Sequence, residues 1–425
     1  MRRLTSIRSG LVLAVLAGGS LSALGQTAPQ PRWYKGNTHT HTWWSDGDTP
    51  PEAVAAWYKE HGYNFLVLSD HNVLSDVEKW LPIKGGPRAE AAVRYERQFG
   101  PDWVEKRVRD GVTEYRLKTL TEFRPLFEEA GKFLMIQGEE ISDAYNKLPV
   151  HVNGVNLKTL IPPQGGATML ETMQNNLDAV YEQSARTGQP MFPHLNHPNF
   201  HWANPVEDIM RLRGQQMVEV HNGHPQVNNY GDADRPSAER IWDICLARRL
   251  GDLKLPVMWG LATDDAHNYL TWEPAKSNPG RGWIVVRSKY LTPQHIVQAV
   301  QRGDFYASTG VELEDVRFAE NVLELRIRPR EGVSYKTEFI GTLADFRAFK
   351  PPATQPWDRT NPAIGKVLAA RDGLNPSYRL TGKELYVRAK VISSAPKENP
   401  YKPGDVEVAW TQPVTPAGAV EAASR

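Results

Sequence analysis

Two histidines near the start of the chain are spaced so that they could bind one metal ion. His39 and His41 lie in the stretch Gly36-Asn-Thr-His-Thr-His-Thr-Trp-Trp-Ser-Asp-Gly47. In an extended backbone, side chains that are two residues apart point to the same side, so both imidazoles can reach one ion. Asp46 follows after a short loop and can bend back as a carboxylate ligand. A His-x-His pair alone is weak evidence, and the prediction of a metal site depends on further ligands along the chain.

Further His, Asp and Glu residues follow apolar runs along the first two thirds of the chain. The candidate metal ligands are His39, His41, Asp46, His71, Glu140, His151, His197, Asp265 and His267. Such a set suits two or three ions better than one, because a zinc ion takes about four ligands. Imidazole mixed with carboxylate, without thiolate, favours Zn, Mn or Fe over Ca or Mg. Two neighbouring ions can lower the pKa of water and hold the attacking and departing oxygens of a hydrolysis. The residues therefore predict a metal-dependent hydrolase.

The elements that must position these residues alternate between strand and helix. Apolar runs over 65–68, 133–136 and 257–262 predict buried strands, and the helical patterns between such runs imply parallel pairing. Each time, the polar cluster falls at the carboxyl end of the strand, where parallel α/β barrels and sheets gather their sites. We predict a barrel-like α/β domain over 33–310, with a charged insertion at about 74–115 that could cover the site.

The chain beyond residue 310 has a different pattern. Apolar and polar residues alternate as in antiparallel strands over 322–327, 335–340, 385–392 and 406–410. Pro-rich connections separate these segments. We predict a small β-sandwich domain over 311–413, followed by a tail of small residues at 414–425.

The N-terminus is typical of an export signal. Arginines supply positive charge at the start, residues 11–24 are small and apolar, and Ala23-Leu24-Gly25 offers a small-x-small cleavage site. The apolar run is short and contains Gly and Ser, which favours cleavage over a permanent membrane span. We predict a signal peptide at 1–25, a linker at 26–32, a periplasmic or secreted protein, and no stable membrane span after cleavage.

Composition excludes several partners. The 425 residues include 50 Lys and Arg against 49 Asp and Glu, so no global field attracts nucleic acid or an anionic membrane. We expect a small anionic substrate and no polymeric nucleic acid. The single Cys245 permits no intramolecular disulfide and lies in an apolar helical pattern typical of a core. The sequence has no Gly-rich phosphate loop, dinucleotide fingerprint or Gly-x-Ser-x-Gly elbow, so nucleotide-driven and serine chemistry have no support.

The ligand motifs, in this order, resemble the PHP (polymerase and histidinol phosphatase) superfamily of metallohydrolases. The matching pieces, which cover most of residues 33–270, are His39-Thr-His41 with Ser45-Asp46-Gly47, Ser69-Asp70-His71-Asn72, Gly138-Glu-Glu140, His151, His197-Pro198 and Asp265-Ala-His267. The resemblance implies a distorted seven-stranded (β/α) barrel with a trinuclear site. By this analogy the three ions are held by His39, His41, Glu140 and Asp265; by Glu140 as a bridge with His151 and His197; and by Asp46, His71 and His267.

Neighbouring residues compete with three of these ligands. Glu139 and Asp264 each precede an assigned carboxylate, and a shift of the alignment by one residue would replace it. His194 competes with His197, which we favour because the family places its histidine directly before proline. Asp46 stands where many members have histidine, which could alter the metal preference of the third position.

Further polar residues could assist a metal-bound hydroxide. Asp70 is expected to orient a ligand or a strand end rather than act as a base. Glu219 and His221 are expected at the rim of the site, with a direct role or with hydrogen bonds to the metal ligands. Arg281 could clamp a phosphate or carboxylate, or form a salt bridge between domains. His201, His224 and His295 have no assigned role.

Two C-terminal segments resemble a particular branch of the superfamily. Gly303-Asp-Phe-Tyr-Ala-Ser-Thr-Gly310 and Ala409-Trp-Thr-Gln-Pro413 are similar to the branch that includes bacterial carbaryl hydrolases. Our first hypothesis is an exported hydrolase of a small phosphoester. The alternatives are an ester, amide or carbamate hydrolase with the same metal site, and a non-catalytic protein that binds a glycan or a partner through its β-domain.

Overall fold

The computed structural model describes residues 29–348 and 357–416. The predicted signal peptide, the first residues of the predicted linker (26–28) and the end of the predicted tail (417–425) lie outside these ranges. Export and the linker therefore stay predictions. Within the described ranges, none of the helices has the length and apolar character that a membrane crossing requires.

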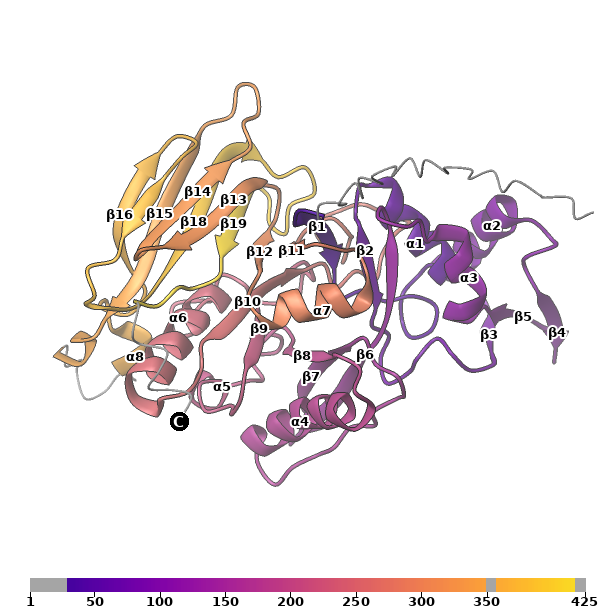
Figure 1. The fold of residues 1–425 in the computed structure, drawn as a ribbon. Helices are drawn as coiled ribbons and strands as arrows, with labels where there is room; N and C mark the ends of the chain where they lie inside the picture. Colours follow the sequence, from indigo (N-terminus) through magenta and orange to yellow (C-terminus); the bar gives the residue numbers. More distant parts are fainter. Residues whose placement is uncertain (1–28, 349–356, 417–425) are drawn as a thin grey trace, which may run out of the picture. The chain divides into compact units, whose positions relative to one another are not determined.

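A mixed sheet of 13 strands runs through the chain (Figure 1). Its α/β part has the order β10-β9-β8-β7-β6-β2-β1-β11. These strands are β1 (Arg32–Asn37), β2 (Phe65–Leu68), β6 (Leu134–Tyr145), β7 (Leu148–Val155), β8 (Phe192–Leu195), β9 (Gln216–Asn222), β10 (Met258–Thr263) and β11 (Trp283–Ser288). β1 with β2, β2 with β6, β8 with β9 and β9 with β10 pair in parallel, whereas β7 and β11 pair antiparallel with their neighbours. The predicted mixed α/β class is confirmed.

The predicted distorted barrel is not confirmed. In the described part of the chain, no strand pairing joins β10 to β11. A side chain connects their ends instead, because Asp264 Oδ1 accepts hydrogen bonds from the backbone N–H groups of Arg281 (2.6 Å) and Gly282 (2.8 Å). The close approach requires glycine, since a Cβ on Gly282 would lie 2.8 Å from the carbonyl oxygen of Thr263.

Helices cover the α/β part of the sheet. They are α1 (Pro51–Glu60), α3 (Leu120–Phe127), α4 (Met169–Thr187), α5 (Val206–Ile209), α6 (Ala238–Arg248) and α7 (Pro293–Gln301), with a π-helical turn at Arg249–Leu253. α4 packs on β7 and β8 through Met173, Leu177 and Val180, which are fully buried and spaced along one helical face. Thr168 caps this helix by accepting a hydrogen bond from the backbone of Glu171. Sequence periodicity thus sets which helical face meets the sheet.

An insertion between β2 and α3 contacts the loop that carries Asp46. It consists of β3 (Lys79–Ile83), α2 (Pro87–Phe99), β4 (Lys106–Arg109) and β5 (Val112–Leu117), with the three strands in one small sheet. Arg88 donates hydrogen bonds to the backbone carbonyls of Ser45 (2.7 Å) and Gly47 (3.2 Å). The insertion therefore helps to fix the position of that loop.

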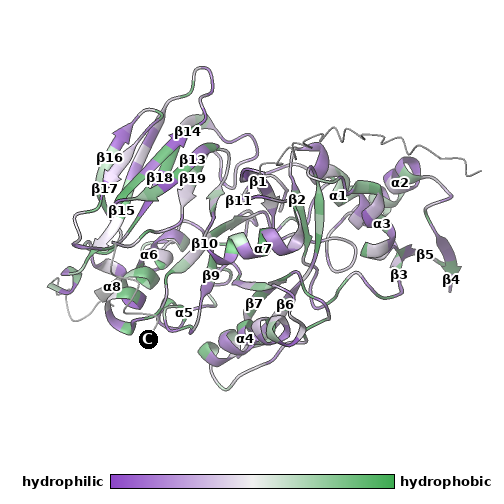
Figure 2. Cartoon of the chain, in the orientation of Figure 1, coloured by the Kyte–Doolittle hydropathy of each residue, from purple (hydrophilic) through white to green (hydrophobic). Residues whose placement is uncertain are grey.

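The large sheet continues into a β-rich part. Its strands are β12 (Phe305–Ser308), β19 (Val406–Thr411), β18 (Glu384–Pro396), β15 (Tyr335–Leu343) and β16 (Lys366–Asp372), and a separate sheet holds β13 (Leu313–Ala319), β14 (Val322–Ile327) and β17 (Ser377–Arg379). Short helical segments occupy Phe346–Ala348 and Trp357–Thr360. Hydrophobic and hydrophilic residues alternate along these strands (Figure 2). Buried Leu323 and Leu325 pack in one cluster with Phe339 and Val387 of the other sheet, so two β-layers share a core.

A buried ionic network joins α6 to β18. Arg388 Nη2 lies 2.7 Å from Asp243 Oδ2 and 2.9 Å from Glu239 Oε1. Lys390 Nζ lies 2.6 Å from Glu239 Oε2. Because the guanidinium and the Asp243 carboxylate are almost fully buried, each depends on the other for compensation of its charge.

Candidate metal centre

The nine predicted ligands come from strands and loops that meet at one end of the α/β sheet. His39 and His41 follow β1, His71 follows β2, and Asp265 follows β10. The loops after β1 and β10 are joined by a bridge between Thr40 and Ala266, which brings their ligands together. The remaining ligands are Asp46 in the loop before α1, Glu140 in β6, His151 in β7, His197 after β8 and His267 after β10.

The ligand atoms form four overlapping groups, and within each group all atoms lie within 4.8 Å of one another. The groups are His41, Asp46, His71 and His267; His39, His197 and Asp265; His39, His41 and Glu140; and His71, Glu140 and His151. Every predicted ligand belongs to at least one group. The fold thus places all nine side chains in one cluster.

Glu140 lies at the centre of this cluster. Its Oε1 is 3.0 Å from His151 Nδ1 and 3.3 Å from His39 Nε2. Its Oε2 is 2.8 Å from His71 Nδ1 and 3.4 Å from His41 Nε2. Burial opposes the charge of this carboxylate, but the surrounding histidines hold its pKa well below the usual range. Glu140 is therefore an ionised carboxylate that presents its two oxygens to different histidines.

The other two carboxylates, those of Asp265 and Asp46, differ in their exposure to solvent. Asp265 Oδ1 is buried and lies 3.2 Å from His39 Nε2 and 3.1 Å from His41 Nε2. Asp46 is more than half exposed, and its oxygens lie 3.3 Å from His267 Nε2 and 3.6 Å from a nitrogen of His71. The cluster therefore has a buried side around Asp265 and an open side around Asp46.

The chemistry of the cluster fits divalent metal ions. His39 Nε2, His41 Nε2, Glu140 Oε2 and His151 Nδ1 are buried atoms without a hydrogen-bond partner in the described part of the chain. Buried polar atoms are costly when they are unpartnered, and metal coordination satisfies them. Burial, together with His267 and His71, lowers the pKa of His41 to about 3, so this imidazole is neutral. Nearby carboxylates raise the pKa of His39, His71 and His267, so metal ions compete with protons for these three rings. Imidazole with carboxylate suits Zn, Mn or Fe.

The three competing neighbours point elsewhere, and none belongs to a metal-capable group. Glu139 Oε1 accepts a hydrogen bond from the backbone of Ile161 at 2.7 Å. Asp264 Oδ2 accepts one from Tyr58 Oη at 2.8 Å. His194 is fully buried, and its Nδ1 lies 3.7 Å from Glu219 Oε1. The geometry therefore favours Glu140, Asp265 and His197 over their neighbours as ligands.

Glu219 supports the cluster from behind and does not lie at a rim, since it is 1% exposed. Its Oε1 is 2.8 Å from His39 Nδ1, which leaves Nε2 of that ring free toward the cluster. Its Oε2 accepts hydrogen bonds from the backbone of His197 (2.7 Å) and the side chain of Asn222 (2.8 Å). A carboxylate behind a metal-ligating histidine fixes the tautomer and orientation of the ring.

Asp70 is buried and contacts the loop that carries Asp46. Its Oδ1 accepts hydrogen bonds from the backbone of Thr42 (2.8 Å) and from Ser45 Oγ (2.6 Å). Its Oδ2 accepts one from Thr42 Oγ1 at 2.9 Å. The side chain thus holds the loop between His41 and Asp46.

His221 and Arg281 lie outside the metal-capable groups. The His221 ring stacks near Trp410, with centroids 5.9 Å apart. The guanidinium of Arg281 donates hydrogen bonds to the carbonyls of Gly223 (2.8 Å) and Glu273 (3.1 Å), and no carboxylate oxygen lies within 4 Å of the guanidinium nitrogens in the described residues. Both side chains line a separate cavity.

Several residues of the cluster were missed from the sequence. Asn196 donates to Glu140 Oε1 at 2.8 Å, and it directly precedes the predicted ligand His197. The His224 ring lies 5.4 Å from that of His267, and the Phe200 ring lies 4.9 Å from that of His197. The signal for Asn196 was its position beside a ligand, whereas nothing in the sequence singled out Phe200.

Comparisons with known proteins give distant similarities only. No protein-family model matches the sequence, and no curated protein matches it. One similar solved structure is a two-domain protein from Bacteroides vulgatus that contains a predicted PHP-like metal-dependent phosphoesterase, with 14% identity, a TM-score of 0.40 and coverage of 90% of this chain and 96% of that one. Another is an amidohydrolase from Chromobacterium violaceum with bound sulfate and no metal, with 13% identity, a TM-score of 0.27 and coverage of 57% and 93%. Neither similarity is close enough to assign a family.

Proposed function

We propose that this protein is an exported metal-dependent hydrolase of the PHP superfamily and that it cleaves a small phosphoester. The observation that carries the proposal is the convergence of six histidines and three carboxylates, in the order of the family motifs, on one cluster of ligand atoms. The proposal includes the fold of that superfamily, a distorted seven-stranded barrel over 33–310 followed by a β-sandwich domain.

The ligands are proposed to hold two or three divalent ions. Glu140 would be shared by two of them, since its oxygens face different histidines. The proposed sets are those of the family analogy: His39, His41, Glu140 and Asp265; Glu140, His151 and His197; and Asp46, His71 and His267. In the structure, His197 groups with His39 and Asp265, and His71 also groups with Glu140 and His151. When bound, such ions act as Lewis acids and generate a nucleophile from water near neutral pH.

The chain's own residues prepare the site for this chemistry. Glu219 holds the tautomer of His39, and Asn196 and Asn222 hold carboxylate oxygens of Glu140 and Asp265. Because these partners are buried and fixed, little reorganisation is needed during the reaction. The half-exposed side around Asp46 is the proposed entrance for an anionic substrate.

A carbamate, ester or amide hydrolase is the second candidate. The aromatic ring of Phe200 lies beside His197 and 6.3 Å from the ring of His151, so that an apolar surface adjoins the ligand cluster. Such a surface suits the aryl group of an aryl carbamate or aryl ester. The resemblance of residues 303–310 and 409–413 to the carbaryl hydrolase branch favours the same candidate.

The function is tested on the purified protein by elemental analysis together with a substrate panel. We expect two to three equivalents of Zn, Mn or Fe and turnover of an aryl phosphate that a chelator abolishes. Turnover of aryl carbamates or acetates without turnover of phosphates would select the second candidate. Activity that the chelator leaves unchanged would refute metal-dependent hydrolysis. Absence of bound metal together with no turnover of any substrate in the panel would refute the hydrolase and support a binding protein.

A further inference from the structure

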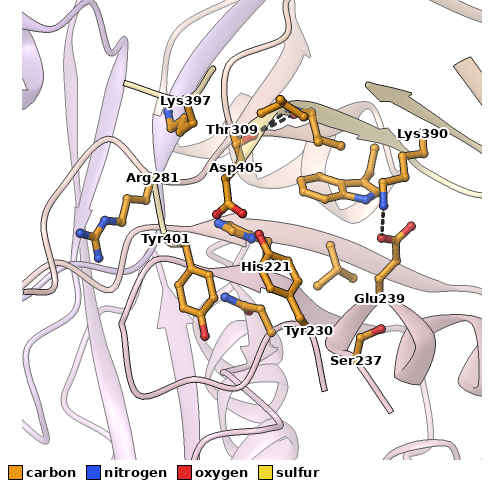
Figure 3. A pocket seen from close by; sticks show the side chains of 15 residues that line it. His221, Tyr230, Ser237, Glu239, Arg281, Thr309, Lys390, Lys397, Tyr401 and Asp405 are labelled. Atoms are coloured by element: carbon orange, nitrogen blue, oxygen red, sulfur yellow. Dashed lines mark hydrogen bonds and ion pairs between the residues drawn. The ribbon is translucent and has the colours of Figure 1, made fainter. Parts of the chain in front are cut away.

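A cavity of about 110 Å³ lies between the α/β part and the β-rich part of the chain. Figure 3 shows Lys397, Arg281 and Tyr401 on one side of this cavity and the hydrogen-bonded pair of Lys390 and Glu239 on the other. The ring of Trp410 and the loop with Asp405 complete the lining. We call this space the rear cavity.

One strand separates the rear cavity from the candidate metal centre. On β9, Glu219 contacts His39, and Asn222 contacts Asp265, so both face the centre. His221 lies between them in sequence but lines the rear cavity. The two sites are therefore distinct and lie back to back across β9.

The rear cavity contains positive charge that no carboxylate neutralises directly. Lys397 has no ion pair within 4 Å in the described part of the chain, and its ammonium group contacts the face of Trp283 instead, 4.6 Å from the ring centroid. Arg281 is 1% exposed, and its guanidinium is hydrogen-bonded to carbonyl and amide oxygens. These acceptors are neutral groups, so they do not neutralise the positive charge of the guanidinium. Burial and these two cations lower the pKa of His221 to about 3.

His221 presents an unused polar atom to this environment. The residue is 5% exposed, and its Nε2 is buried without a hydrogen-bond partner in the described residues. A buried polar atom of this kind normally has a partner in the protein, in ordered water or in a ligand. A neutral imidazole has one N–H, and the ring of His221 is hydrogen-bonded to the backbone of Arg281, so its Nε2 is left as an acceptor.

Two carboxylates also line the rear cavity, and they differ in their partners. Glu239 is compensated by Arg388 and Lys390. Asp405 accepts a hydrogen bond from the backbone of Lys402 at 2.8 Å but has no cationic side chain within 4 Å in the described ranges. An ionised carboxylate only accepts hydrogen bonds, so Asp405 favours an anion that still carries an O–H group.

We propose that the rear cavity binds a small protonated oxyanion of the hydrogen phosphate type. Lys397 donates to its oxygens, Arg281 contributes charge, and Asp405 accepts its O–H, while His221 lines the same cavity and reports on its occupancy. The volume agrees with such a ligand, because a cavity of 150 Å³ holds the six heavy atoms of benzene. Phosphate has five heavy atoms. The inference goes beyond the proposed function and does not depend on it.

The experiment follows the ring resonances of His221 by NMR during titration of the metal-loaded protein with inorganic phosphate. The resonance is assigned by its loss in His221→Gln. We expect saturable shifts at His221 with phosphate, at least tenfold weaker binding of sulfate, which has no O–H at neutral pH, and weak binding of acetate. A response of the histidines of the metal centre alone would overturn the proposal, because phosphate would then bind only at that centre.

Two variants and a matched control test the assigned donors and acceptor. Lys397→Met should weaken phosphate binding at His221 by about tenfold to a hundredfold, since one charge-assisted hydrogen bond is lost. Lys402→Met removes the same charge from an exposed neighbouring position that does not line the cavity, and should leave binding unchanged. Asp405→Asn should abolish the preference for phosphate over sulfate.

The result can also contradict the proposal in two further ways. Equal weakening by Lys397→Met and Lys402→Met would mean general electrostatic attraction rather than a site. Equal affinity for phosphate and sulfate in the wild-type protein would remove the role of Asp405. If Lys397→Met does not fold, the proposal is still tested by the wild-type protein. The test is then its affinity for phosphate compared with sulfate, measured from the shifts of the His221 resonances.

Discussion

The two oxygens of Glu140 face different histidines, with His151 and His39 near Oε1 and His71 and His41 near Oε2. A carboxylate in this position can join two ions, and its loss affects both. Glu139, next to it in the sequence, points out of the cluster. Variants of Glu140 and Glu139 can therefore be compared, because only Glu140 is positioned to bridge two metal ions.

Glu140→Gln is expected to remove more than one equivalent of metal from the purified protein. The amide nitrogen cannot ligate an ion, so one of the two bridged positions loses its ligand and the other loses its shared charge. Glu139→Gln is the control, because burial raises the pKa of Glu139 to about 8 and a neutral amide resembles its protonated form. Elemental analysis measures both. Loss of a single equivalent from Glu140→Gln would show that this carboxylate does not bridge.

Glu219→Gln is expected to weaken metal affinity by about tenfold to a hundredfold while leaving the protein able to take up metal at saturation. The amide can still accept a hydrogen bond, but it no longer stabilises the N–H tautomer of His39 with a full charge. Competition with a chelator of known affinity measures the effect. Unchanged affinity would assign Glu219 a purely structural role.

The sequence predicted residues that the fold gathers in one cluster, but it could not distinguish neighbours such as Glu139 and Glu140. On a strand, adjacent side chains point to opposite faces, so the choice depends on which face turns inward. That is decided by strand pairing, which a single sequence does not show. Glu219 was noticed but expected at a rim, because burial of a carboxylate becomes plausible only once its partners His39 and Asn222 are known.

At the scale of elements, the alternation of strand and helix was predictable because it follows from apolar periodicity and from Gly and Pro positions. The relation between β10 and β11 was not. Asp264 connects them through backbone N–H groups more than 15 residues later in the chain. Local patterns carry no information about such a contact. The ionic contact between α6 and β18 is equally remote in sequence, and it has a measurable consequence.

Arg388→Met is expected to destabilise the protein by about 3–5 kcal/mol, because it leaves the buried Asp243 carboxylate without its counter-charge. Arg371→Met, on the exposed face of β16, is the control and should change stability by less than about 0.5 kcal/mol. Denaturant unfolding measures the difference. Similar stability of the two variants would show that the network contributes no more than a surface pair.

At the scale of the whole molecule, six loops and strands that are far apart in sequence are held together at the metal centre. The loops after β1 and β10 meet through Thr40 and Ala266, and β6 meets the loop after β2 through Glu140 and His71. Each of these contacts brings ionisable side chains to within a few ångströms of one another. Without cations, the buried carboxylates lack full compensation, so the fold and the ions should stabilise each other.

Removal of metal by a chelator is therefore expected to lower Tm by several degrees. A ligand that binds only the folded state stabilises it by about 2.7 kcal/mol when its free concentration is a hundred times Kd. Re-addition of Zn or Mn should restore Tm.

Glu140→Gln separates this effect from general salt dependence. If the bound ions account for the fall in Tm, the variant should start from a lower Tm and respond little to chelator, because it has already lost the shared ions. Glu139→Gln should respond as the wild-type protein does. A Tm that is the same with and without chelator in the wild-type protein would mean that the histidines and carboxylates of the cluster compensate one another without metal, through protonated pairs such as His71 with Glu140.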